Sequence, residues 1–286
     1  MTLFKKLVLL VAITFTSHSH CASVWKVSSD THSLYIGGTI HVLAKEDYPL
    51  PKEYDQAFKL VDQLVFETDM SVVNSPEFAQ KMMGQMMFAD GTTIDKILKP
   101  AAYTALKAHL DARGIPMQNF ASFKPSLLAI TLSMLELQIL GLTSEGVDLY
   151  YSKLAAKKNK PQLWLESPDQ QIEFLLKMGQ SDHDAMIEYT LKDIKKMPNM
   201  IDTLRKAWRI GDMPALAEVG IKEFITDYPE IYQDLLVTRN HNWLPQIEKM
   251  LNTEPVEFVL VGALHLAGPD SVLTSLQSKG YKVEKL

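Results

Sequence analysis

The sequence has few of the features that mark disulfide-stabilised, membrane-spanning or nucleic-acid-binding proteins. Its 286 residues include one cysteine, Cys21, which excludes an internal disulfide and a cysteine-based zinc site. No basic stripe with interleaved aromatic residues is present, so a nucleic-acid partner is not expected. The chain also has no HExxH helix and no Gly-x-Ser-x-Gly elbow, which excludes two well-known hydrolase classes. What remains is a globular composition, 47% hydrophobic with a net charge of -5.

The N-terminus has the layout of a secretory signal peptide. Two lysines precede an apolar run from Leu7 to about Phe15, and small or polar residues follow. The run is shorter than the roughly 20 residues that span a bilayer. We therefore predict a signal peptide over residues 1–22, cleaved near Cys21, a periplasmic or secreted mature protein, and no membrane span after cleavage. The alternative for this segment is a buried N-terminal helix.

Two α/β segments flank a long helical region. Strands are predicted by short apolar or alternating runs at 33–37, 64–66, 256–261 and 281–286. Pro51 suits the first turn of a helix between the first two strands, and Pro269 begins another helix between the last two. We predict an α/β fold in one domain, residues 23–286, whose sheet is built from the N- and C-terminal βα halves, with a helical insertion over about 71–250.

Within the insertion, the apolar spacing predicts several helices and one strand. The helices are expected at 102–113, 126–140 and 147–157. Residues 162–165 are typical of a buried strand. From residue 170 onwards we expect helices that are broken at Gly179, Pro198 and Pro214. Asp182 precedes a polar helix start, where a capping role is favoured over metal binding.

A motif repeated at the two ends of the chain carries the functional prediction. Gly38-Thr39-Ile40-His41 and Gly262-Ala263-Leu264-His265 are both Gly-x-x-His, and each follows an apolar strand. One such motif has little specificity, but two in the same context are harder to attribute to chance. Glycine lets the backbone turn or approach a ligand closely, and the histidine can then face the end of the sheet.

Glu67 ends a third apolar run in the same way. In α/β sheets ligands bind at the carboxyl ends of the strands, so His41, Glu67 and His265 are expected to meet there if their strands are neighbours. Two histidines and a carboxylate suit a divalent metal such as Mn²⁺, Co²⁺ or Zn²⁺, which would activate a water molecule. The alternative is that each histidine is a packed, hydrogen-bonded core residue. The other histidines named here do not follow such a motif, and we expect them to be surface or helix residues: His32, His109, His183 and His241.

Several runs together resemble the TraB/GumN family, which includes Tiki-type proteases and is distantly similar to erythromycin esterases and ChaN-like haem-binding lipoproteins. The runs that carry this resemblance are Tyr35 to Leu43, Asp47 to Pro51, Val65 to Asp69, Gly146-Val147-Asp148, Leu165-Glu166-Ser167 with Gln171, Arg239-Asn240 with Trp243, and Val261 to His265. They cover nearly the whole chain after the predicted signal peptide.

The resemblance implies one sheet around a shared cleft, with His41, Glu67 and His265 as the metal or catalytic centre. It also implies that Glu166 is a further ligand or base, although a buried, hydrogen-bonded carboxylate is the alternative. Arg239 could hold a substrate carboxylate or stabilise an oxyanion, or it could form a salt bridge at a helix end. Asp69 is expected to be a structural partner.

Three hypotheses for function follow. The first is an exported metal-dependent hydrolase, a peptidase or amidase acting on a peptide or small molecule. The second is a non-catalytic periplasmic protein that binds a peptide or haem on the same scaffold, for which a Met-rich segment, residues 82–87, could line an apolar cleft. The third is a structural protein of the cell envelope, in which His41 and His265 could be replaced without effect.

Overall fold

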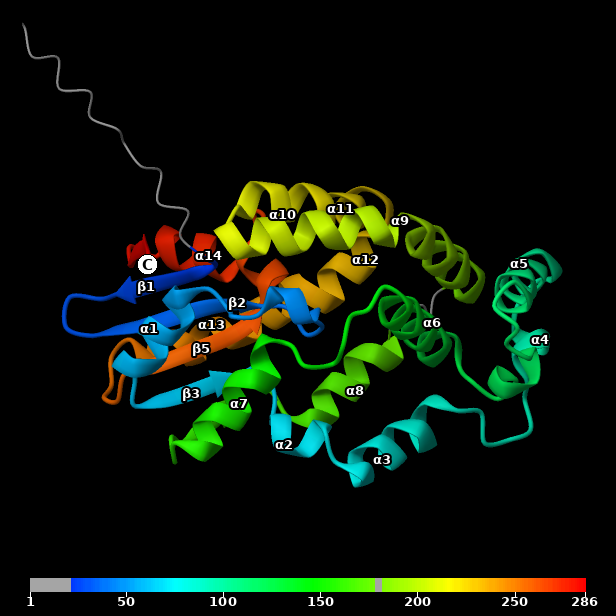
Figure 1. The fold of residues 1–286 in the computed structure, drawn as a ribbon, viewed down its shortest axis with the longest axis horizontal. Coiled ribbons are helices and arrows are strands. Elements are labelled where there is room, and N and C mark those ends of the chain that lie inside the picture. Colours follow the sequence, from blue (N-terminus) through cyan, green and yellow to red (C-terminus); the bar gives the residue numbers. More distant parts are fainter. Residues whose placement is uncertain (1–21, 178–181) are drawn as a thin grey trace, which may run out of the picture.

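The computed structural model describes residues 22–177 and 182–286 (Figure 1). The predicted signal peptide, apart from its last residue, and Gly179 lie outside this range. Within the range, no helix is long and apolar enough to cross a membrane. Figure 1 shows the sheet at one end of the molecule and the helices α4 and α5 at the other.

A mixed sheet of six strands organises the fold. In the order in which neighbours are hydrogen-bonded, the strands are β4 (Gln162–Trp164), β3 (Gln63–Phe66), β5 (Glu257–Gly262), β2 (Ser33–Thr39), β1 (Val24–Ser28) and β6 (Lys282–Lys285). The first four of these run parallel to one another, and the last two join antiparallel at the β2 edge. The N- and C-terminal segments therefore share one sheet, as the sequence predicts.

The strands alternate between two apolar layers because successive side chains point to opposite faces. Phe66 and Phe258 pack on one face in a cluster that includes Tyr151 of α7 (Val147–Lys157) and residues of α1 (Lys52–Leu60). On the other face, Val65 and Val259 pack in a cluster with α13 (Thr238–Met250) and α14 (Val272–Ser278). Helices on both faces are what a parallel sheet requires in order to be buried.

A helical part extends from this core and has an apolar cluster of its own. The cluster joins Leu106, Leu132 and Ile187, which come from α5, α6 and α9. The helices between β3 and β5 that have not yet been given bounds are α2 (Met70–Val73), α3 (Pro76–Met86), α4 (Ile94–Ile97), α5 (Pro100–Asp111), α6 (Pro125–Ile139), α8 (Pro168–Lys177), α9 (His183–Ile210), α10 (Met213–Gly220), α11 (Lys222–Asp227) and α12 (Pro229–Tyr232). Short 3-10 turns lie at Lys45–Asp47, Met117–Phe120 and Ala263–Leu266.

Two expectations about the insertion are wrong. Strand β4 lies inside the insertion, where the run at 162–165 predicts a strand, but it is an edge strand rather than a buried one, since Leu163 and Trp164 are 43% and 47% exposed. Pro198 does not break a helix but lies inside α9, which is 28 residues long and continues on both sides of the proline. In contrast, Asp182 caps α9 as expected, because its side chain accepts a hydrogen bond from the Ala185 N–H.

Candidate functional site

The four parallel strands end beside one another, and each leads into one of the polar residues named above. In sheet order, β4 precedes Glu166, β3 precedes Glu67, β5 precedes His265 and β2 precedes His41. The two Gly-x-x-His strands are neighbours in register, with Thr39 opposite Gly262. The carboxyl edge of the sheet therefore gathers the predicted residues, and α13 adds Arg239 to them.

The loop that carries His41 is held from two sides. The Gly38 carbonyl accepts hydrogen bonds from the Trp208 indole N–H, at 2.7 Å, and from the Tyr54 hydroxyl. On the other side, Gly146 contacts the Ile40 and His41 backbone so closely that any Cβ at this position would overlap their carbonyl groups. This close approach brings the first turn of α7 against the loop.

Asp148, in that first turn, orients the His41 ring. Its Oδ2 lies 3.1 Å from His41 Nδ1, and the carboxyl group is buried. An Nδ1–H that donates to Asp148 leaves the lone pair on Nε2. Asp148 raises the pKa of His41 above its ordinary 6.5, mainly through its charge. The His41 side chain is 63% exposed, so water screens part of this attraction.

Arg239 is the centre of a buried ion-pair cluster. Its Nη2 lies 2.5 Å from Glu67 Oε2 and 2.6 Å from Glu166 Oε1, while its Nε donates to Glu166 Oε2 at 3.2 Å. Its Nη1 faces His265 Nε2 at 3.2 Å and the Leu235 carbonyl at 3.4 Å. Every N–H of the guanidinium is therefore engaged inside the protein. Arg239 supplies a fixed positive charge but has no spare donor for a substrate oxyanion or carboxylate.

A π-helical turn, Gln233–Val237, directly precedes α13, whose second residue is Arg239. Such turns insert one residue into a helix and are frequent at functional sites, because they shift the side chains that follow. The guanidinium also lies over the Trp243 ring, with 4.7 Å between the Arg239 Cζ and the ring centroid. Trp243 in turn donates its indole N–H to Glu166 Oε2 at 3.1 Å.

Glu67 links the ion-pair cluster to the second Gly-x-x-His motif. Its Oε1 accepts the Gly262 N–H at 2.6 Å, and its other oxygen faces Arg239. Burial alone would raise the pKa of Glu67, but the Arg239 charge outweighs it and holds this pKa well below 4.5. A Cβ built on Gly262 would lie 3.1 Å from Glu67 Oε1 and 3.8 Å from His41 Nε2. Glycine at this position therefore keeps open the space that His41 and Glu67 border.

His265 is a neutral, buried member of the same cluster. Its Nδ1 lies 2.7 Å from Asn240 Oδ1, while the Asn240 amide nitrogen faces the Asp270 carbonyl at 2.8 Å. This network assigns the proton to Nδ1, so Nε2 accepts from Arg239. Burial lowers the pKa of His265 from 6.5 to about 3, and the Arg239 charge adds to the shift although Glu67 opposes it. The motif histidine that follows β5 thus has a structural role that the one following β2 lacks.

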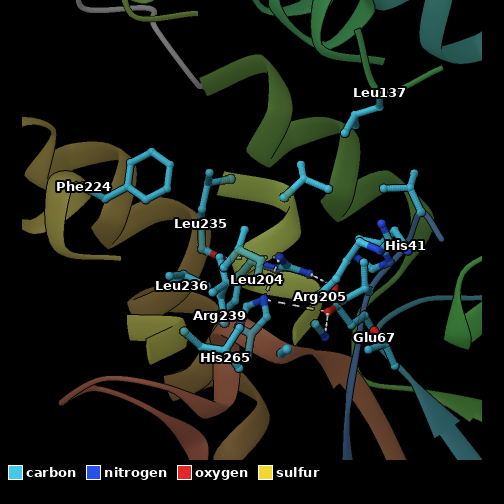
Figure 2. A pocket seen from close by; sticks show the side chains of 18 of the residues that line it. His41, Glu67, Leu137, Leu204, Arg205, Phe224, Leu235, Leu236, Arg239 and His265 are labelled. Atoms are coloured by element: carbon cyan, nitrogen blue, oxygen red, sulfur yellow. Dashed lines mark hydrogen bonds and ion pairs between the residues drawn. The ribbon is translucent and has the colours of Figure 1, made fainter. Parts of the chain in front are cut away.

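A cavity of about 430 Å³ opens beside the cluster, within the range of about 300–1,000 Å³ that holds small-molecule ligands. Its side chains are almost all apolar away from the cluster. Figure 2 shows Phe224 and Leu235 on one side of this cavity and His41 with Glu67 on the other, with Arg239 between them. A ligand in the cavity would therefore contact the imidazole of His41 at one end.

The donor atoms proposed for a metal do not form an open set in this arrangement. Glu67 Oε2, both oxygens of Glu166 and His265 Nε2 all face the Arg239 guanidinium. In residues 22–177 and 182–286, no three His, Asp or Glu side chains are grouped as a metal site. A cation bound by His41, Glu67 and His265 would have to displace the positively charged guanidinium of Arg239. A divalent metal at this site stays a prediction.

The five predicted residues lie together, but three supporting residues had no predicted role. Asp148, Asn240 and Trp243 orient His41, His265 and Glu166, respectively. All three lie in runs that carry the family resemblance, which was the available signal for them. Asp69 is not in the cluster, since β3 ends at Phe66 and the Asp69 side chain instead caps α2 by accepting from the Ser71 N–H.

The chain is similar to known proteins along most of its length. The chain is 24% identical over 233 residues to the uncharacterized protein YbaP of Escherichia coli (strain K12), which covers 81% of this chain and 83% of that protein. It is 25% identical over 239 residues to the uncharacterized protein YbaP of Shigella flexneri, and this match covers 83% of this chain and 84% of that protein. No solved structure matches the chain. The model of the TraB/PrgY/gumN family matches residues 23–285, which include every residue of the site, and the chain therefore belongs to this family.

Proposed function

We propose that this protein is an exported hydrolase of carboxylic esters or amides in which His41 is the general base. The observation that carries the proposal is the difference between His41 and its neighbours. Glu67, Glu166, Arg239 and His265 bond to one another, whereas His41 Nε2 has no hydrogen-bond partner among the described residues and borders the large cavity. A held Nδ1 and a free Nε2 are what a general base needs.

The reaction follows from the charges around this ring. Neutral His41 accepts a proton from a water molecule at Nε2 as the water oxygen attacks the substrate carbonyl carbon. The imidazolium that forms is stabilised by the carboxylates of Asp148 and Glu67, both of which favour the charged ring. The same proton then passes to the leaving alkoxide or amine as its bond to carbon breaks. Arg239 keeps Glu67 ionised and in place, so it acts as a positioning residue.

Removing the imidazole is the direct test. We expect His41→Ala to lower kcat/KM at least about 100-fold on any ester or amide that the wild type hydrolyses, found by screening p-nitrophenyl esters and a fluorogenic peptide library. His241→Ala is the matched control, because His241 is an exposed histidine on α13, away from the cavity. Equal activity of the His41→Ala variant and the wild type would overturn the proposal.

The second candidate function is binding without turnover, and the apolar lining of the cavity favours it. A peptide or haem would be held beside His41 and released unchanged. Added hemin would give a Soret band that His41→Ala alters, and a bound peptide would be recovered intact. Saturable binding with no product from any substrate in the screen would select this function over hydrolysis.

The proposed export rests on the N-terminal sequence, residues 1–22. N-terminal sequencing of the protein from fractionated cells tests it. We expect the mature chain to begin near Ser23 and to leave the cytoplasm. A full-length chain in the cytoplasmic fraction would contradict export.

A further inference from the structure

His41 and Glu67 stand between two cavities rather than at the end of one. The cavity of about 430 Å³ described above lies on one side, and a second of about 290 Å³ lies on the other. The two share Thr39, His41 and Glu67 in their linings. A substrate whose reacting carbonyl lies at His41 can therefore extend in two directions, with one half in each cavity.

The larger cavity, here called the acyl cavity, is apolar away from the ion-pair cluster. Its wall includes Ile40, Leu137, Leu204, Phe224, Leu235 and Leu264. Two polar side chains of that wall are already engaged: Arg205 binds the Asp47 carboxylate through two nitrogens at 2.6 and 2.8 Å, and the Tyr232 hydroxyl donates to Asp270 at 2.8 Å. A peptide chain here would bury N–H and C=O groups without side-chain partners, which is unfavourable. A hydrocarbon chain has no such groups.

The second cavity has a mixed lining, with apolar side chains such as Met70, Val73 and Leu149 and a group of polar side chains near His41. Thr39, Thr68 and Asp148 line it, each at least nine-tenths buried. Thr39 Oγ1, Thr68 Oγ1 and Asp148 Oδ1 have no hydrogen-bond partner within the described part of the chain. Buried polar atoms are nearly always hydrogen-bonded, so these three indicate that a polar group enters the cavity. A ligand with hydroxyl groups could both donate to Asp148 and pair with the threonines.

We propose that the substrate is a fatty-acyl ester or amide of a hydroxyl-bearing group. Its chain lies in the acyl cavity and its polar half in the second cavity. This inference rests on the proposed hydrolase function and specifies its substrate. Water adds its oxygen to the acyl carbon, the C–O or C–N bond breaks, and the proton taken up by His41 passes to the leaving oxygen or nitrogen. The products are a fatty acid and a polar alcohol or amine.

Chain length tests the acyl cavity. Each buried CH₂ group strengthens binding by about fourfold, so kcat/KM should rise at least tenfold from p-nitrophenyl acetate to p-nitrophenyl octanoate. Leu204→Trp narrows the cavity, and we expect it to remove this rise in kcat/KM with chain length. A circular dichroism spectrum and a melting temperature close to those of the wild type show that the variant is folded. A wild type that prefers the acetate, or a variant that keeps the full rise, would overturn the inference.

The second cavity is tested by one isosteric change. Thr68→Val removes a hydroxyl and keeps the side-chain volume. It should lower kcat/KM about tenfold for monooctanoylglycerol, whose leaving group carries hydroxyls, and by a clearly smaller factor for p-nitrophenyl octanoate. An equal effect on both substrates, or no effect on either, would contradict a polar leaving-group site.

A binding measurement separates this inference from the proposed function. Decanoate should bind to the His41→Ala variant in a calorimetric titration. Adding Leu204→Trp to this variant should raise the Kd at least tenfold. Decanoate binding without hydrolysis of any ester would support the acyl cavity and overturn the hydrolase. Hydrolysis without decanoate binding or chain-length preference would support the hydrolase and overturn the acyl cavity.

Discussion

At the scale of single residues, the pair formed by His41 and Asp148 sets the pH at which the proposed base works. Asp148 raises the pKa of His41 above 6.5, so the imidazole loses its proton only at higher pH. We therefore expect kcat/KM to rise as the pH passes through this raised pKa of His41. Asp148→Asn removes the charge and should move the pKa of His41 down toward 6.5. The rising limb of the pH–rate profile should move to lower pH with it, while the maximum rate falls because the ring is less well oriented.

Two measurements check this prediction independently. NMR titration of the His41 ring protons gives its pKa in both proteins, and the pH dependence of kcat/KM gives the catalytic value. The two should shift together. A variant whose rate falls while its pH–rate profile stays in place would show that Asp148 supports the loop but does not tune the base.

Arg239 supports a different prediction, about stability. Its side chain is 11% exposed, and it compensates the charges of Glu67 and Glu166, which are 9% and 4% exposed at their side chains. Arg239→Leu would leave two carboxylates facing each other in a buried site, and removing one partner from such a cluster costs about 3–5 kcal/mol. We expect that loss in the free energy of unfolding, measured by urea denaturation.

The control for this change is an exposed ion pair. Lys107 and Asp111 on α5 are 51% and 56% exposed, so water screens their attraction. Lys107→Met should change the free energy of unfolding by less than about 1 kcal/mol. Similar losses in Arg239→Leu and Lys107→Met would mean that the buried cluster contributes no more than a surface pair.

At the scale of elements, the contact between α7 and the β2 loop depends on one residue. A Cβ at Gly146 would overlap the carbonyl groups of Ile40 and His41, so Gly146→Ala must move α7 away and take Asp148 from His41. We expect the same downward shift in the His41 pKa as in Asp148→Asn, with a lower melting temperature. Gly84→Ala is the control, because Gly84 lies in α3 with nothing within 4 Å and alanine there should stabilise the helix slightly.

The elements that the sequence predicts best are those whose local pattern agrees with their burial. Residues 147–157 form α7 with the predicted bounds, and the strands at both ends of the chain occur where apolar runs predict them. The sequence predicts strand β4 but not its exposure, because Leu163 and Trp164 are apolar yet lie at an exposed sheet edge, which depends on tertiary position. The sequence also does not predict that α9 continues through Pro198, because a long helix can accommodate a proline when neighbouring packing holds it.

For the site, the sequence predicts where the two histidines lie but not what each of them does. The repeated motif predicts that His41 and His265 meet at one sheet edge, and they do, since β2 and β5 are neighbours. The motif could not predict that the two imidazoles differ in role. That difference comes from Asp148 and Asn240, which lie more than 100 and 20 residues away along the chain, respectively, and each of which reaches one ring.

At the scale of the whole molecule, the neutral His265 makes stability depend on pH. Its pKa of about 3 in the folded protein lies below the unfolded value, so the unfolded chain takes up the proton first as pH falls below 6.5. Folding stability should then fall by up to about 1.4 kcal/mol per pH unit. His265→Gln should lack this component when urea unfolding is compared at pH 7 and 5. The raised pKa of His41 acts above pH 6.5, where its contribution to stability is lost, so the two windows are separate.

The charge balance of the cluster also bears on the predicted metal. Arg239 places a permanent positive charge between Glu67, Glu166 and His265, where a divalent ion would supply a similar charge. If this arrangement is the working one, hydrolysis should survive incubation with EDTA, and the purified protein should hold far less than one equivalent of Mn²⁺, Co²⁺ or Zn²⁺. The opposite result is equally informative. Stoichiometric metal in the wild type that is lost in His41→Ala/His265→Ala would require the guanidinium to move away from His265, and activity that returns with added metal would establish the centre predicted from the two motifs.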